Sequence, residues 1–332
     1  MSSKVLVTGG AGYIGSHTVR ALRSAGREVV VLDSLELGSA DAVIDAELVV
    51  GDIADTALVE SLCREHGVGQ IVHFAAYKNV GESMEHPAKY WRNNVSGTVE
   101  LLEAALAGGV GHVVFSSSCS VYGTPAAVPV TEEAPIRPES VYAETKAMIE
   151  RILGWYGTTR GLRSVSLRYF NAAGASFDAV IGEDWRFSLN LVPLVMKALL
   201  LPDHSIKVFG DDYDTRDGTC IRDYIHVDDL ADCHVKALDH LAAGGASTAV
   251  NVGTGVGSTV LEVIGSAAEV AGRAVPYEIV ARRAGDPVAT FAEPSRAEEL
   301  LGWRARHGLD EIVRSAYIWH RSQLERAEPR SR

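Results

Sequence analysis

The chain has 332 residues, of which 47% are hydrophobic and 22% are charged. This length and composition exclude a peptide, a disulfide-stapled miniprotein and a disordered or fibrous chain, and they predict about two domains of roughly 150 residues each. The 43 acidic residues outnumber the 31 basic ones, for a formal net charge of -12, which argues against nucleic acid or an anionic membrane surface as a partner.

The first half of the chain repeats a short apolar, β-branched run followed by a longer segment of helical character. The predicted strands are residues 4–8, 29–33, 48–52, 71–75, 112–116 and 164–169. The predicted helices between them are residues 16–25, 56–65, 91–107 and 142–158. Strands that are apolar throughout and alternate with helices predict an α/β fold with a doubly wound parallel sheet, which binds ligands at the carboxyl ends of its strands.

After about Asn171 this alternation gives way to loops, short strands and two terminal helices. We expect residues 1–175 to form the first domain, with segments near 222–253 returning to it, and residues 176–332 to form a second, smaller α/β domain. The longest apolar run, residues 189–201, contains Asn190, Pro193 and Lys197. It is shorter than the roughly 20 residues that cross a bilayer, so it predicts a buried helix and no membrane partner.

The turn after the first predicted strand carries Gly9, Gly12 and Gly15, a GxxGxxG variant of the dinucleotide fingerprint. Side chains at the first two positions would obstruct the tight turn or the approach of a pyrophosphate. The third glycine lets the helix close on the strand, and the helix amino terminus offers N–H donors to an anion. The glycines alone are also compatible with a tight turn that binds nothing, but in this context they predict a Rossmann-type domain.

Acidic residues follow the next two predicted strands. Asp33 ends the second strand, where a carboxylate can accept both ribose hydroxyls of an adenosine and would repel an added phosphate. This favours NAD over NADP as the cofactor. Asp52 and Ile53 follow the third strand and are placed to meet an adenine ring, although Asp52 is equally suited to cap a helix.

Tyr142 and Lys146 stand at i and i+4, on one face of a predicted helix. A tyrosine has a pKa of about 10, and a nearby cation, helped by the positive charge of a nicotinamide, stabilises the phenolate and lowers that pKa, which makes Tyr142 a candidate proton acceptor. The fifth predicted strand ends in a run of serines closed by Ser118, at the sheet edge where a substrate hydroxyl would meet a cofactor. The alternatives are a solvated helix face and a polar strand end.

Several phrases together resemble the UDP-glucose 4-epimerase family of the extended short-chain dehydrogenases/reductases over essentially the full chain. They are TGGAGYIGSH at 8–17, HFAAYK at 73–78, VGES at 80–83, NNVSGT at 93–98, SSSCSVYG at 116–123, RYFN at 168–171 and RDYIHV at 222–227. The YxxxK and RDYIHV phrases are shared across that superfamily. Their combination with VGES and RYFN is much more specific.

The resemblance implies an NAD-dependent isomerase that interconverts UDP-galactose and UDP-glucose by reversible hydride transfer at C4, through a 4-keto sugar. The catalytic residues that it implies are Ser118, Tyr142 and Lys146. The implied cofactor contacts are Gly9, Gly12, Tyr13, Ile14, Gly15, Asp33, Asp52, Ile53, Phe74, Ala75, Lys78, Asn93, Tyr142, Lys146 and Tyr169. The implied contacts with the nucleotide sugar are Ser118, Tyr142, Asn171, Asn190, Phe209, Arg222, Arg283, Asp286 and Thr290.

Two of these assignments have a physical consequence. Arg222 and Arg283 would give an acidic protein the planar, multi-donor cations that a pyrophosphate needs, unless they are surface or ion-paired arginines. The position of Thr290 is bulky in family members restricted to unmodified hexoses. Its smaller side chain leaves room beside C2 of the sugar, which predicts that UDP-N-acetylglucosamine and UDP-N-acetylgalactosamine are also substrates.

Three alternatives stay open. One is another NAD-dependent nucleotide-sugar 4-epimerase. A nucleotide-sugar dehydratase or decarboxylase is disfavoured, because those families resemble one another in an acidic residue just after the serine run, where this chain has Cys119 and Ser120. A non-catalytic dinucleotide sensor would have no need of a tuned phenol.

The remaining expectations concern the setting of the protein. Four cysteines without metal-ligand spacing predict neither a disulfide framework nor a metal site, and with no visible export signal they favour the cytoplasm. Relatives generally pair through helices, so we expect a homodimer with residues 91–107 and the helix of Tyr142 as candidate contacts.

Overall fold

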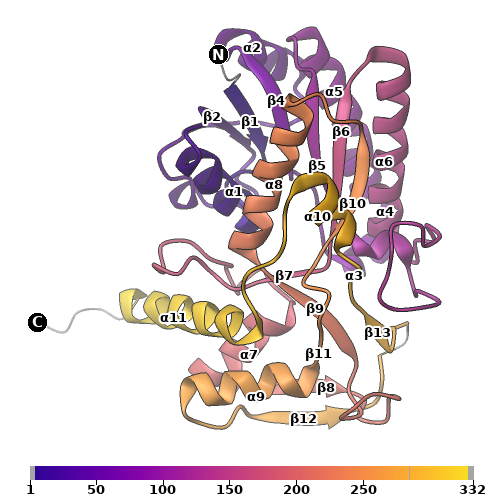
Figure 1. Ribbon diagram of the computed structural model, residues 1–332. Helices are drawn as coiled ribbons and strands as arrows, with labels where there is room; N and C mark the ends of the chain where they lie inside the picture. Colours follow the sequence, from indigo (N-terminus) through magenta and orange to yellow (C-terminus); the bar gives the residue numbers. More distant parts are fainter. Residues whose placement is uncertain (1–3, 284, 328–332) are drawn as a thin grey trace, which may run out of the picture.

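The computed structural model describes residues 4–283 and 285–327. The chain forms an upper body around a large sheet and a smaller lower body (Figure 1). The large sheet has seven strands in the order β10-β6-β5-β4-β1-β2-β3, and all of its pairings are parallel. The predicted doubly wound sheet with a smaller second domain is therefore confirmed.

The strands of the large sheet are β1 (Lys4–Thr8), β2 (Val29–Asp33), β3 (Glu47–Val50), β4 (Val68–His73), β5 (His112–Ser118), β6 (Arg163–Tyr169) and β10 (Thr248–Val252). The helices of the upper body are α1 (Tyr13–Ser24), α2 (Thr56–His66), α3 (Val80–Glu85), α4 (Pro87–Tyr90), α5 (Gly97–Ala107), α6 (Val141–Arg160), α8 (Val227–Ala242) and α10 (Ser295–Leu301), with short turns η1 (Ala40–Ala42) and η3 (Cys119–Tyr122). β3 and β4 end earlier than predicted, so Asp52 and Ala75 lie in the loops beyond them.

The predicted helix over residues 91–107 is not uniform. Its first part, η2 (Trp91–Ser96), is a π-helix, and α-helical geometry begins at Gly97. The wider turn includes the fully buried Asn94, whose side chain accepts from the backbone N–H of Tyr77 at 2.9 Å and donates to its carbonyl at 3.0 Å. An amide that pairs with the backbone in this way competes with regular helix geometry, and π turns are frequent at functional sites.

Local signals fix the ends of α6. The Ser140 hydroxyl accepts from the backbone N–H of Ala143 at 3.2 Å, and Gly161 ends the helix in the left-handed conformation with φ of 72°. A serine cap and a glycine stop define the two ends of this helix. They hold Tyr142 in its first turn, where the chain leaves the sheet edge.

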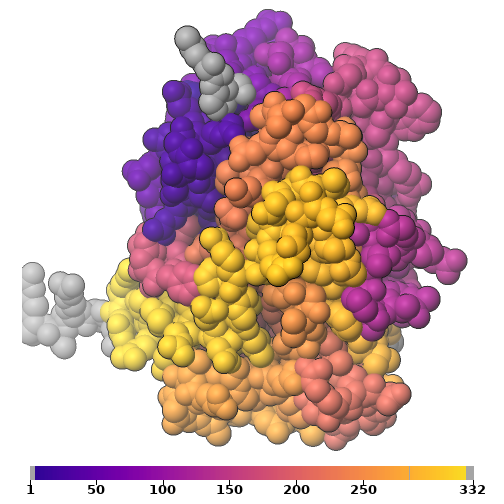
Figure 2. Space-filling model, viewed as in Figure 1, coloured from indigo at the N-terminus to yellow at the C-terminus, as the bar shows by residue number. Residues whose placement is uncertain are grey.

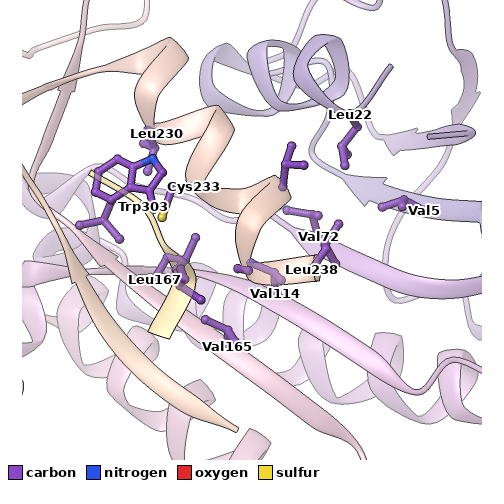
Figure 3. Close-up of a cluster of buried hydrophobic side chains, with 14 of the residues drawn as sticks. Val5, Leu22, Val72, Val114, Val165, Leu167, Leu230, Cys233, Leu238 and Trp303 are labelled. Carbon is purple, nitrogen blue, oxygen red and sulfur yellow. The ribbon is translucent and has the colours of Figure 1, made fainter. Parts of the chain in front are cut away.

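The pleat of β1 explains the two cores of the upper body. Val5 and Val7 face one layer, while Leu6 between them faces the other. The first layer is covered by α1 and α8, and Figure 3 shows Leu22, Leu230 and Trp303 in it. The second layer is covered by α2, α5 and α6. Burial on both faces accounts for the uninterrupted apolar character of the strands.

Over the described residues, the lower body comprises two further sheets and three helices. They are formed by β7 (Asn171–Ala173), β9 (Ile221–His226), β11 (Gly257–Thr259) and β13 (Ala289–Thr290), by β8 (Ile206–Phe209) and β12 (Tyr277–Val280), and by α7 (Leu191–Leu200), α9 (Val260–Ala271) and α11 (Leu309–Ala327). The largely buried α7 is the helix that the apolar run predicted. In Figure 2 the orange α8 and the yellow α10 lie across the upper body. None of the helices among the described residues is long and apolar enough to cross a membrane.

Candidate functional site

The glycine turn after β1 is built by backbone contacts that leave no room for side chains. A Cβ on Gly9 would lie 2.6 Å from the backbone nitrogen of Ala75, and the φ of Gly9 is +73°. A Cβ on Gly15 would lie 2.2 Å from the Gly9 carbonyl oxygen. The first and third glycines are therefore required for the turn and for the approach of α1 to it.

The amino terminus of α1 suits an anionic ligand. Its capping residue is Gly12, which has no side chain to occupy the helix end. Within the described chain the first turn carries no acidic residue. The N–H groups of Tyr13 and Ile14 lie in the first turn of the helix, where backbone N–H groups have no intrahelical partner and can bind a pyrophosphate. This turn fits the predicted dinucleotide.

Asp33 is buried at the end of β2 with its carboxylate fixed by the backbone. One oxygen accepts from the N–H of Ala11 and the other from the N–H of Leu35, both at 2.9 Å. A carboxylate has further acceptor capacity, which a ribose diol can use. Asp52 bonds to the N–H of Ala54 at 2.8 Å, while Asp55 caps α2, so capping is not the role of Asp52.

The structure brings the three predicted catalytic side chains together. The Tyr142 phenol lies close enough to the Ser118 hydroxyl for that hydroxyl to favour the phenolate. The Lys146 ammonium lies 5.8 Å from the centre of the Tyr142 ring and donates to the Ser116 carbonyl at 2.7 Å. These groups come from adjacent elements at the carboxyl edge of the sheet, β5 and α6, as the sequence predicted.

The electrostatics differ from the sequence-based expectation. Burial raises the pKa of Tyr142 well above its usual range, although the Ser118 hydroxyl opposes the shift. Burial also lowers the pKa of Lys146 to about 7, partly offset by the charge of Glu150. In the chain by itself, desolvation outweighs the neighbouring cation, so the positive nicotinamide ring of a bound cofactor would have to help Lys146 to stabilise the phenolate.

A second group of predicted residues meets in the lower body. Arg222 lies 3.4 Å from Asp286 and donates to the Pro287 carbonyl at 2.9 Å. Thr290 is the strand partner of Arg222 in the β13 and β9 pairing. In the same part of the chain the Arg283 guanidinium lies 4.2 Å from the ring centre of Phe209. Arg222 is therefore ion-paired and Arg283 is exposed, as the alternative interpretation of these arginines expected, and the two partners orient guanidinium groups that have further donors for a phosphate.

The two groups of residues adjoin one another. Burial raises the pKa of Cys119, the neighbour of Ser118, to about 12, and the charge of Arg222 opposes this shift. Asn171, at the start of β7, donates to the backbone carbonyl of Asp223 at 3.0 Å, which ties it to the residue after Arg222. The catalytic and the cationic residues thus line neighbouring parts of one site.

The other predicted residues lie around this centre. Tyr169 ends β6, and its hydroxyl is hydrogen-bonded to Ser116. Asn93 lies in η2 and donates to Asn94 at 2.9 Å. Ile53 is buried in the loop after β3, and the ring centre of Phe74, after β4, is 4.7 Å from that of His234. Lys78 and Asn190 both contact Glu183, which the sequence analysis did not identify.

Asp223 is another residue that the motifs did not single out. Its fully buried carboxylate accepts from Thr254 N–H at 2.9 Å, Thr254 Oγ1 at 2.7 Å and Ala292 N–H at 3.1 Å. It fastens β9, with Arg222, to the segments that follow β10 and β13. Only the RDYIHV phrase pointed to this place. In the described part of the chain no cluster of three potential metal ligands occurs.

Comparisons with known proteins agree with this geometry. A model of the NAD dependent epimerase/dehydratase family matches residues 5–253. UDP-glucose 4-epimerase of Lactobacillus helveticus is 44% identical over 96% of this chain and 97% of that protein. The crystal structure of UDP-glucose-4-epimerase from Stenotrophomonas maltophila with bound NAD and formylated UDP-arabinopyranose has a TM-score of 0.95 and 42% identity, covering 98% of this chain and 100% of the other.

A third relative has a broader named substrate range. The UDP-Glc/GlcNAc 4-epimerase from Campylobacter jejuni has a TM-score of 0.85 and 38% identity to this chain. The alignment covers 97% of this chain and 100% of that one.

Proposed function

Since the chain belongs to the NAD dependent epimerase/dehydratase family, we propose that it interconverts UDP-galactose and UDP-glucose by inverting C4 of the sugar, with NAD as its cofactor. It is an isomerase that consumes no external oxidant or reductant. The observation that carries this proposal is the Tyr142 phenol, near the Ser118 hydroxyl and beside the Lys146 ammonium, at the carboxyl edge of the parallel sheet.

Each side chain has a task in this reaction. Tyr142 takes the proton of the sugar 4-hydroxyl and Ser118 shares that hydrogen bond, which prepares C4 to lose its hydride and become a ketone. When bound, NAD would accept this hydride and later return it, and its positive ring would favour the Tyr142 phenolate. Once the sugar has turned and C4 has regained a hydride on its opposite face, Tyr142 gives the proton back to O4.

Inversion requires the sugar to present both faces while the substrate stays bound. Arg222 and Arg283 hold the diphosphate in this proposal, and Asp286 orients Arg222 from 3.4 Å. Binding energy placed on the nucleotide rather than on the hexose leaves the hexose free to rotate about its glycosidic linkage. The 4-keto sugar can then be reduced from its opposite face.

The decisive experiment uses purified protein and UDP-galactose deuterated at C4, with no reductant added. We expect UDP-glucose to appear and the deuterium to remain on C4. Loss of the label to water would contradict hydride transfer. Absence of UDP-glucose despite tight NAD binding would favour the dinucleotide sensor instead.

Thr290 carries a second proposal, that N-acetylated UDP-hexoses are also substrates. Thr290 is buried at the strand position opposite Arg222, and the Campylobacter jejuni relative is named for both sugar classes. We expect Thr290→Tyr to fill the space beside C2, lowering kcat/KM for UDP-N-acetylglucosamine about tenfold or more while leaving UDP-galactose turnover largely intact. Coupled assays with both sugars measure the ratio, and an unchanged ratio in this variant contradicts the role of Thr290.

The chain organisation supports a division into residues 1–175 as the NAD-binding domain, joined by segments near 222–253, and residues 176–332 as the nucleotide-sugar domain. Two contacts support the return of the segments near 222–253 to the first domain. α8 packs against α1, and β10 pairs with β6. The cytoplasm is the setting that fits best, because each of the four cysteines, all within the described ranges, is free.

A homodimer through α6 and the neighbouring α5 is also part of the proposal. Trp155 of α6 is 69% exposed, and aromatic side chains are enriched at the centres of protein interfaces. We expect sedimentation velocity to give twice the 35.5 kDa chain mass. Trp155→Glu should shift that mass to the monomer, since a central aromatic contributes about 2 kcal/mol or more to an interface. A wild-type monomer, or a dimer that Trp155→Glu leaves intact, would contradict this contact.

A further inference from the structure

Glu183 is a nearly fully buried carboxylate between two predicted ligand contacts. Its Oε1 accepts from Asn190 Nδ2 at 3.0 Å and lies 3.5 Å from Lys78 Nζ. The Glu183 side chain is 6% exposed, whereas that of Lys78 is 56% exposed. The other carboxylate oxygen of Glu183, Oε2, is buried and has no hydrogen-bond partner among the described residues. Burial of an incompletely paired carboxylate is costly, so its retention calls for a role.

The surrounding chain fixes this carboxylate in place. The Glu183 carbonyl accepts from the Trp319 indole N–H at 3.0 Å. A Cβ on the preceding Gly182 would lie 2.7 Å from the Trp319 ring, so the loop packs directly on α11. Gly182 also forms an antiparallel bridge with Ala175. The position of Glu183 is thus set from its backbone and not by the groups that it contacts.

Glu183 determines which way the Asn190 amide points. A carboxylate only accepts, so the amide must turn its NH₂ group toward Glu183, which leaves the second N–H free to donate. No other group among the described residues is seen to fix this amide, since Asn190 precedes α7 without a side-chain capping bond. A flipped amide would present its oxygen instead and repel an anion.

The ligand group that suits the free N–H is a phosphate. Asn190 stands at the amino terminus of α7, where backbone N–H groups and the helix dipole favour an anion. The Lys78 ammonium offsets the charge of Glu183, so that the carboxylate can lie near a diphosphate. Glu183 also helps to raise the pKa of Tyr13, which places its charge within reach of the glycine turn.

We propose that Glu183 is a positioning residue that orients the Asn190 amide toward the diphosphate of the nucleotide sugar, with Lys78 as its counter-charge. This inference rests on the proposed function, because it deepens the binding of the UDP moiety. Glu183 does not touch the reacting atoms. It acts through Asn190, so its loss should weaken binding of the diphosphate more than it slows the chemical step.

The test compares Glu183→Met with wild type in binding UDP and uridine, by calorimetry on NAD-loaded protein. We expect UDP affinity to fall about tenfold or more, as for loss of a hydrogen bond to a charged group, while uridine affinity stays unchanged. KM for UDP-galactose should rise with little change in kcat. The matched control is Glu60→Met on α2, whose carboxylate pairs with Arg64 at 2.6 Å, and it should bind UDP as wild type does.

A double-variant cycle separates positioning from general loosening of the fold. Adding Asn190→Ala to Glu183→Met should cost little further UDP affinity, because both changes remove one interaction. Equal losses for UDP and uridine, or fully additive losses, would overturn the proposal. If Glu183→Met does not fold, the isosteric Glu183→Gln must show a smaller but still UDP-selective loss.

The measurements distinguish a failure of this inference from a failure of the epimerase assignment. Wild-type protein that binds UDP but does not epimerise UDP-galactose would overturn the proposed function and leave the binding measurements valid. Wild-type protein that epimerises, combined with a Glu183→Met variant that binds UDP normally, would overturn only this inference.

Discussion

Replacing Tyr142 with phenylalanine should lower kcat for UDP-galactose by about 10²–10⁴, the usual contribution of a positioned acid or base. The substitution removes one oxygen and keeps the ring, so the packing against Lys146 is preserved. The Ser118 hydroxyl keeps the hydrogen bond from Ser120 Oγ at 2.9 Å. Because the UDP contacts lie elsewhere, calorimetry should find the UDP affinity unchanged.

A matched control distinguishes chemistry from folding. Tyr277→Phe removes a hydroxyl from a tyrosine that is 46% exposed on β12, outside the site, and should leave kcat unchanged. A Tyr142→Phe variant that retained more than a tenth of wild-type turnover at neutral pH would contradict its role as the proton acceptor. A variant that also lost UDP binding would instead indicate a damaged site.

The strands of the large sheet were predictable because each is indicated by its own short run of residues. β1 and β2 have the predicted bounds, since both are short apolar runs that end at a glycine turn or an aspartate. The π turn at residues 91–96 was not predictable, because it depends on the pairing of Asn94 with the backbone of Tyr77, residues that come together only in the folded chain. Periodicity alone predicts a regular helix there.

The site residues also fall into those that the sequence revealed and those that it did not. Tyr142 and Lys146 were found by their spacing on one helix, and Ser118 by its place at a strand end. Glu183 and Asp223 were missed, because a buried carboxylate has no spacing signature and its value comes from partners distant in sequence. The raised pKa of Tyr142 was missed for a related reason, since the degree of burial is a property of the whole fold.

Beneath the catalytic residues lies a buried ion pair that the sequence also did not reveal. Arg168 of β6 contacts Glu150 of α6 through Nε at 3.0 Å and Nη2 at 2.6 Å. Their side chains are 9% and 12% exposed. Glu150 stands one turn beyond Lys146 and its charge favours the ammonium form of that lysine. The same ion pair therefore bears on both the stability of the sheet and the charge of Lys146.

Arg168→Met should lower the free energy of unfolding by about 3–5 kcal/mol, because it leaves the Glu150 carboxylate buried without its cation. Urea unfolding followed by fluorescence measures the change. The control is Arg216→Met, whose partner Glu262 and own side chain are 40% and 48% exposed. An exposed pair contributes about 0–1 kcal/mol, so this control should be nearly neutral.

The double variant Arg168→Met/Glu150→Met decides what the ion pair contributes. If the cost of the single change comes from an orphaned charge, removing both partners should restore most of the lost stability, since apolar side chains of similar size can replace a buried pair at little cost. Arg168 also donates to the Tyr122 hydroxyl at 2.9 Å. The double variant still lacks this bond, so the stability that it does not recover corresponds to the loss of the bond. A double variant as unstable as Arg168→Met alone would show that the arginine acts through packing and Tyr122. In that case the charge of Glu150 would matter for Lys146 and not for the fold.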